Sequence, residues 1–131
     1  MAVEIERRFL VKNDAWRGLA EPKFLYQGYL SVEKERTMRV RIVGDEAWVT
    51  IKGYISDVSR HEFEYAIPVA DATTILEQMC PFKLKKHRTC IAYQGHVFEV
   101  DEYFDDNAPL VVAEIELSSE DTLFERPEWL G

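Results

Sequence analysis

Residues 3–11 read VEIERRFLV, a stretch in which charged and apolar side chains alternate. Successive side chains of a β-strand point to opposite faces of a sheet, so a strand here separates the two kinds. One face then carries Glu4, Glu6 and Arg8, and the other carries Ile5, Phe9 and Val11. The stretch therefore predicts a strand with one apolar face and one face made of charges.

The same alternation recurs between turn residues along the chain and predicts about eight strands. The remaining strands are expected over residues 24–32, 37–43, 47–52, 60–67, 84–93, 96–103 and 110–117. Gly44-Asp45 and Gln94-Gly95 are typical of tight hairpin turns. Two short helices are expected, one over residues 13–20 with Asp14 as its cap and one over residues 71–80.

Charged residues of the other strands also share one face. By position along each strand, this face carries the cations Arg8, Arg39, Arg41, Lys52, Arg60, Lys86 and Arg88 and the acids Glu4, Glu6, Glu62, Glu64, Glu99, Asp101, Glu114 and Glu116. One interpretation is a half-buried sheet whose charged face meets water. Such faces usually also contain Thr, Ser and Gln, whereas this one is almost entirely ionic. We therefore favour a mainly β (α+β) closed antiparallel barrel with a charged lumen and a few short outer helices.

A lumen that holds both signs of charge at low dielectric needs a ligand. Arginine side chains bind phosphate oxygens through two parallel hydrogen bonds, and carboxylate oxygens are the ligands that Mg²⁺ and Mn²⁺ prefer. The charged face therefore predicts a site for a polyphosphate and a divalent metal ion.

Composition narrows the classes of partner. The 131 residues, 47% of them apolar, suffice for one domain with its own core. A formal charge of −8 argues against nucleic acid as a partner. The apolar runs are shorter than a membrane-spanning helix, and the N-terminus opens on acidic residues, so we expect a cytoplasmic protein without a membrane partner.

Several motifs, in order along the chain, resemble those of the CYTH, or triphosphate tunnel metalloenzyme, family. The family signature E-x-E-x-K is similar to Glu4-Ile5-Glu6-Arg7-Arg8, in which Arg8 replaces the lysine and keeps its charge. The later matches are Gln27-Gly28-Tyr29-Leu30, Arg39-Val40-Arg41, Thr50-Ile51-Lys52-Gly53, Arg60-x-Glu62-x-Glu64-Tyr65, Lys86-x-Arg88, Val100-Asp101 and Ala113-Glu114-Ile115-Glu116-Leu117. The resemblance covers essentially the whole chain.

This resemblance implies a tunnel of about eight antiparallel strands in a protein that hydrolyses or cyclises triphosphate compounds with a divalent metal. Similar short bacterial members continue beyond the Pro-x-Trp-Leu-Gly sequence of residues 127–131, so we expect residues 1–131 to be one tunnel domain that lacks the family's C-terminal segment. Inorganic triphosphate is the expected substrate, because nothing in the chain indicates a base-recognition pocket. The alternatives are a thiamine or nucleoside triphosphatase, a class IV-type adenylate cyclase and a non-catalytic polyphosphate-binding module.

Individual roles follow from residue type and position. Paired acids two residues apart put two oxygen donors on one face, so the expected ligands of Mg²⁺ or Mn²⁺ are Glu4, Glu6, Glu114 and Glu116, supported by Glu62, Glu64 and Asp101. The expected phosphate-binding residues are Arg8, Arg39, Arg41, Lys52, Arg60, Lys86 and Arg88. Lys52 or Lys86 is expected to orient the attacking water during catalysis.

A charged lumen also turns the apolar face of every strand outward. Two short helices are too few to cover the circumference of such a barrel. We therefore expect uncovered apolar residues on the outer wall and a homodimer that buries them.

Overall fold

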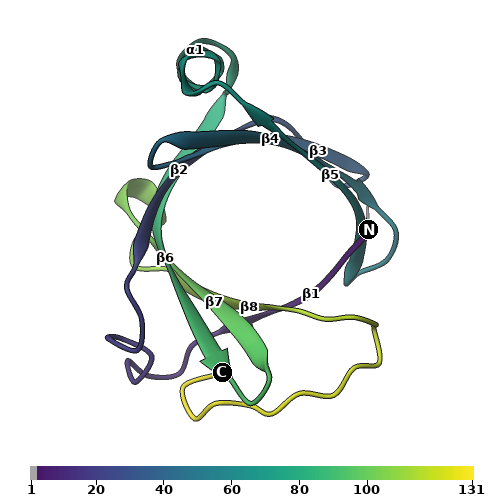
Figure 1. Ribbon diagram of the computed structural model, residues 1–131, viewed down its shortest axis with the longest axis vertical. Helices are drawn as coiled ribbons and strands as arrows, with labels where there is room; N and C mark the ends of the chain where they lie inside the picture. The colour runs from purple at the N-terminus through teal and green to yellow at the C-terminus, as the bar shows by residue number, and fades with distance from the viewer. Residues whose placement is uncertain (1–2) are drawn as a thin grey trace.

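Eight antiparallel strands close into a barrel in the computed structural model, which describes residues 3–131 (Figure 1). The order around the barrel is β1-β5-β4-β3-β2-β6-β7-β8, and β1 pairs with β8 to close it. The elements are β1 (Val3–Leu10), β2 (Lys23–Glu33), β3 (Arg36–Val43), β4 (Glu46–Tyr54), β5 (Ser59–Ile67), α1 (Val69–Met79), β6 (Phe82–Tyr93), β7 (His96–Tyr103), the short 3₁₀ turn η1 (Asp105–Asn107) and β8 (Val111–Glu116). The predicted closed antiparallel barrel is confirmed.

The barrel has two ends that differ in the turns they carry. The hairpins β3–β4 and β6–β7 turn at one end through Gly44 and Gly95, whose positive φ angles are accessible to glycine without steric cost. The β2–β3 turn at residues 34–35 and the β4–β5 loop at residues 55–58 lie at the opposite end, because neighbouring strands are antiparallel. We name these the glycine-turn end and the loop end.

Irregular segments cover the outer wall formed by β1, β7 and β8. Phe98 and Ile115 point away from the lumen and are buried in one cluster with Trp16 and Trp129. Trp16 belongs to the connection between β1 and β2, whereas Trp129 belongs to the C-terminal tail, which runs beside β7 and β8 (Figure 1). Much of the apolar wall that we expected to be exposed is therefore covered, which corrects that expectation.

The helix α1 covers the wall formed by β2, β3 and β4. Its Ala72 and Leu76 are buried in one cluster with Val40 and Ala47. Gly28 on β2 allows this close approach, because a Cβ atom there would lie 2.7 Å from Cδ2 of Leu76. A side chain at residue 28 would therefore push the helix away from the barrel.

The helix expected over residues 13–20 is not formed, and the segment makes turns instead. The side-chain Oδ1 of Asn13 accepts a hydrogen bond of 2.9 Å from the backbone N–H of Ala15, and Gly18 has a φ of 79°. Both features favour a turn over a helix, so the predicted cap at Asp14 has no helix to begin. The second expected helix is present as α1 and begins at Val69.

Three large apolar side chains stay exposed on the outer face of β4 and β5. Ile51 is 40% exposed, its cross-strand partner Phe63 is 43% exposed, and Tyr65 is 58% exposed. A homodimer that buries these residues stays a prediction. Within residues 3–131, none of the helices combines the length and the apolar character needed to cross a membrane.

Candidate functional site

The barrel contains a cavity of about 430 Å³, the tunnel, lined by inward-facing side chains from all eight strands. Strand alternation places the charged residues on this face. The lining residues are Glu4, Glu6, Arg8, Gln27, Tyr29, Thr37, Arg39, Arg41, Thr50, Lys52, Arg60, Glu62, Glu64, Lys86, Arg88, Glu99, Tyr103, Glu114 and Glu116. The structure thus brings together all sequence-predicted site residues except Asp101, which is fully buried within the wall.

Residue charge alone does not identify five uncharged lining residues, namely Gln27, Tyr29, Thr37, Thr50 and Tyr103. Thr50 Oγ1 donates to Glu64 Oε2 at 2.8 Å and accepts from Arg39 Nη2 at 3.2 Å. Gln27 Oε1 accepts from Arg41 Nε at 2.9 Å. Thr37, Thr50 and Tyr103 each lie two positions from a charged inward residue on the same strand, so position rather than residue type identifies these three.

Asp101 anchors two of the predicted phosphate-binding residues. Its Oδ2 accepts hydrogen bonds from Lys86 Nζ at 2.7 Å and from Arg88 Nη2 at 2.9 Å, and its Oδ1 accepts from Arg88 Nε at 2.8 Å. Burial alone would raise the pKa of Asp101, but the hydrogen bonds from Arg88 and the charge of Lys86 outweigh burial and lower this pKa. Both oxygens of Asp101, which we expected to support a metal ion, are thus occupied by cations of the wall.

Lys86 is held in the wall with only 3% of its surface exposed. Burial lowers its pKa to about 8; the positive charges of Arg88 and Arg41 act in the same direction, while Asp101 opposes them. Lys86 is therefore mostly protonated at pH 7 and about half protonated one pH unit higher.

Arg39 and Arg41 are the next inward residues of β3. Among the described residues, Arg39 lacks a hydrogen-bond partner for one buried donor, and Arg41 lacks an acidic partner. Burial lowers the pKa of Arg41 to about 10, and the like charges of Arg39 and Arg88 add to this effect. Between residues 3 and 131, Arg41 has no carboxylate partner at ion-pair distance, and the buried Nε of Arg39 has no hydrogen-bond partner. Buried donors without partners are rare in proteins, so this wall is suited to an anionic ligand.

Acids gather on β1 and β8, where Glu6 and Glu116 are cross-strand neighbours. Burial raises the pKa of Glu114, and Glu6 raises it further against the opposing effect of Arg8. Burial also raises the pKa of Glu116, with a contribution from Glu4. In the described part of the chain, no three acids, histidines or cysteines form a ready-made metal cluster. The all-oxygen donors and their mutual repulsion nevertheless fit the chemistry of Mg²⁺ or Mn²⁺.

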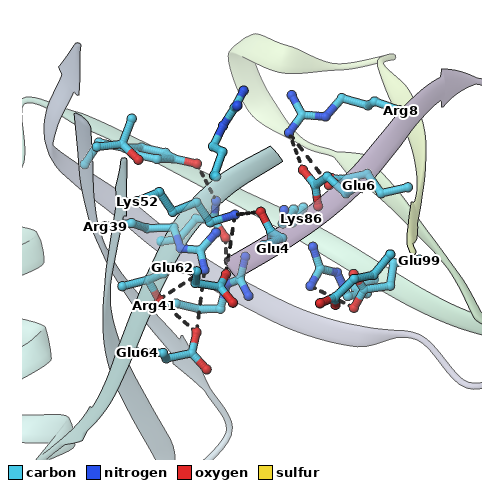
Figure 2. A pocket seen from close by; sticks show the side chains of 18 of the residues that line it. Glu4, Glu6, Arg8, Arg39, Arg41, Lys52, Glu62, Glu64, Lys86 and Glu99 are labelled. Carbon is cyan, nitrogen blue, oxygen red and sulfur yellow. Dashed lines mark hydrogen bonds and ion pairs between the residues drawn. The ribbon is translucent and has the colours of Figure 1, made fainter. Parts of the chain in front are cut away.

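Lys52 connects the acids of β1 with those of β5 (Figure 2). Its Nζ lies 2.8 Å from Glu4 Oε1 and 3.6 Å from Glu62 Oε2. Arg8 lies closer to solvent, with its Nη2 3.1 Å from Glu6 Oε1. The tunnel therefore contains ion pairs of its own that a charged ligand would rearrange.

The tunnel residues lie within a region that resembles known proteins along its whole length. A family model described as CYTH domain matches residues 2–131. The chain is 41% identical to an inorganic triphosphatase of Acetivibrio thermocellus, across 100% of this chain and 85% of that protein. It is 32% identical to an inorganic triphosphatase of Nitrosomonas europaea, across 98% of this chain and 86% of that protein.

A solved structure has the same arrangement of strands. The crystal structure of the inorganic triphosphatase NE1496 superposes on this chain with a TM-score of 0.68 at 30% sequence identity. The superposition covers 100% of this chain and 85% of that structure. The similarity in fold therefore includes every strand that contributes to the tunnel.

Proposed function

This chain belongs to the CYTH domain family, and we propose from this membership and from its tunnel that it hydrolyses inorganic triphosphate with a divalent metal ion. The observation that carries the proposal is the tunnel lining, which contains seven lysines and arginines and seven glutamates. Such a lining suits a compact polyanion together with a metal ion better than it suits a purine base or another apolar group.

We propose that inward residues of β3 and β6, the two strands on either side of β2, bind the phosphate chain. Arg39 has an unused buried N–H group, and Arg41 has no acidic partner in the described chain. Phosphate oxygens would accept hydrogen bonds from both guanidinium groups, which can bind them in a bidentate manner. Arg88 and Lys86 would add two further cations, and the same role is proposed for Arg8, Lys52 and Arg60.

The proposed ligands of Mg²⁺ or Mn²⁺ are Glu4, Glu6, Glu114 and Glu116, with Glu62 and Glu64 in support. Burial first and the charge of Glu6 second raise the pKa of Glu114, and a bound cation would oppose both effects, which supports this role. A bound divalent ion neutralises charge on phosphate oxygens and lowers the pKa of bound water.

We assign different roles in the reaction to the two tunnel lysines. Lys86, with a pKa of about 8, is mostly protonated at pH 7 and would donate a hydrogen bond to a phosphate oxygen as negative charge develops on it. Lys52 is held by Glu4 and Glu62 beside the acids and would orient the attacking water from that side.

A phosphate-release assay tests the proposed function. The purified chain is supplied with Mg²⁺ or Mn²⁺ and with inorganic triphosphate, thiamine triphosphate or ATP, and cyclic AMP is measured in the ATP sample. We expect orthophosphate mainly from inorganic triphosphate, loss of activity with EDTA and recovery with added metal. Cyclic AMP as the main product, or tight binding without turnover, would contradict the proposal.

A further inference from the structure

The exposed charged side chains that line the tunnel differ in sign between its two ends. Glu64 lies late in β5 and Glu99 early in β7, which places both toward the glycine-turn end, and their side chains are 46% and 39% exposed. Arg8 lies late in β1, toward the loop end, and its side chain is 64% exposed. Figure 2 shows Arg8 and Glu64 on opposite sides of the pocket. A charged ligand therefore meets different surfaces at the two ends.

A second cavity of about 320 Å³ adjoins the tunnel at the loop end. It is lined by Glu6, Arg7, Arg8, Phe9, Asp57, Val58 and Arg60. Three of these residues, Glu6, Arg8 and Arg60, also line the tunnel, so the two cavities share a boundary. We name this second cavity the arginine mouth.

Two of the three arginines in the mouth keep an uncompensated charge. Arg7 Nη2 donates to the backbone carbonyl of Glu120 at 2.9 Å, and Arg60 Nη1 donates to that of Ser56 at 3.2 Å. Carbonyl oxygens orient a guanidinium group without cancelling its charge. Within residues 3–131, neither Arg7 nor Arg60 has a carboxylate at ion-pair distance. Each keeps further N–H donors for a ligand.

We propose that the arginine mouth is an anion-docking site at which inorganic triphosphate first binds and from which it enters the tunnel. The identity of this anion rests on the proposed function. The whole chain has a formal charge of −8 and repels a polyanion, whereas clustered guanidinium groups concentrate anions locally and raise the association rate. At the glycine-turn end, the partly exposed carboxylates of Glu64 and Glu99 would repel an incoming polyanion.

Charge reversal at Arg7 tests the docking site, because this residue does not line the tunnel. Arg7→Glu should lower kcat/KM for inorganic triphosphate roughly threefold to tenfold at low salt and leave kcat unchanged. The difference should disappear near an ionic strength of about 1 M, where the screening length is about 3 Å. Lys85→Glu is the matched control, since Lys85 is exposed on β6 and lines neither cavity.

A second variant separates charge from structure. Asp57 accepts a hydrogen bond from the hydroxyl of Tyr54 at 3.1 Å and lines the arginine mouth. Asp57→Asn keeps an acceptor but removes a negative charge, so kcat/KM at low salt should rise. A general loosening of the structure would lower kcat/KM in both Arg7→Glu and Asp57→Asn. The docking site instead predicts that kcat/KM falls in Arg7→Glu and rises in Asp57→Asn.

The outcomes distinguish this inference from the proposed function. Isothermal titration calorimetry with inorganic triphosphate in EDTA measures binding without turnover. Weaker binding in Arg7→Glu but not in Lys85→Glu would support the docking site. If the unmodified chain then failed to hydrolyse triphosphate, the docking site would stand and the proposed hydrolysis would be contradicted. Normal hydrolysis with equal kcat/KM in Arg7→Glu and Lys85→Glu would overturn the docking site and leave the proposed function standing.

Discussion

The Nζ of Lys86 lies 2.7 Å from the Oδ2 of Asp101, and both side chains are buried in the tunnel wall. Burial lowers the pKa of Lys86 to about 8, and the negative charge of Asp101 keeps it from falling further. A residue that does not line the tunnel thus raises the pKa of one that does, against the larger effect of burial.

Activity that requires protonated Lys86 should decrease as the pH rises through about 8. In Asp101→Asn the opposing negative charge is lost, the pKa of Lys86 falls further, and the alkaline limb of kcat should move to lower pH. Profiles of kcat against pH measure this shift. Asp105→Asn removes an acid outside the tunnel lining and should leave the limb in place. Superimposable profiles for Asp101→Asn and the unmodified chain would rule out this coupling.

Substitutions within the lumen should remove activity without unfolding the protein. Glu6→Gln, Glu116→Gln and Arg41→Ala are each expected to reduce kcat on the order of a hundredfold or more, because these groups face the ligand rather than the apolar clusters. Phosphate release measures the loss, and circular dichroism checks the fold. Glu77→Gln, on the exposed surface of α1, is the control. Near-normal turnover in all three lumen variants would refute the assignment of the site.

Removing the charge of Glu114 should stabilise the metal-free protein. The folded pKa of Glu114 lies above its ordinary value of 4.5, because of burial first and Glu6 second. The folded state therefore binds more protons than the unfolded state in the pH window above 4.5, and stability falls as the pH rises through that window. Glu114→Gln removes this effect, so its Tm in EDTA should exceed that of the unmodified chain more at pH 7 than at pH 4. A gain that does not depend on pH would point to another cause.

The exposed apolar residues of β4 and β5 should mediate a dimer. Ile51 and Phe63 face each other across the two strands, and burying them removes apolar surface from water. Light scattering at micromolar concentration should give the dimer mass, and Phe63→Thr should shift it toward the monomer. Val97→Thr changes an exposed residue on β7 and should not. A monomeric mass for the unmodified chain would disprove the interface.

Strand alternation predicts the face on which a side chain lies but not its depth. Glu99 and Asp101 share a face of β7, yet Glu99 lines the tunnel whereas Asp101 is fully buried. The difference depends on the pairing of β6 with β7, which sets Asp101 opposite Arg88, and alternation does not specify that register. Alternation also does not predict that Trp16 and Trp129 cover the outer face of β7 and β8. Both residues belong to irregular segments, which have no periodic pattern of apolar residues.

The pairing of β1 with β8 also matters while the chain is being synthesised. Glu6 and Glu116 meet across this seam although they lie near opposite ends of the sequence, so the lumen is completed only after β8 leaves the ribosome. Until then β1 and β7 each present an unpaired strand edge, a ready template for joining strands of other nascent chains. Arrival of β8 covers both edges at once, so completion of the lumen and protection from aggregation occur in the same step.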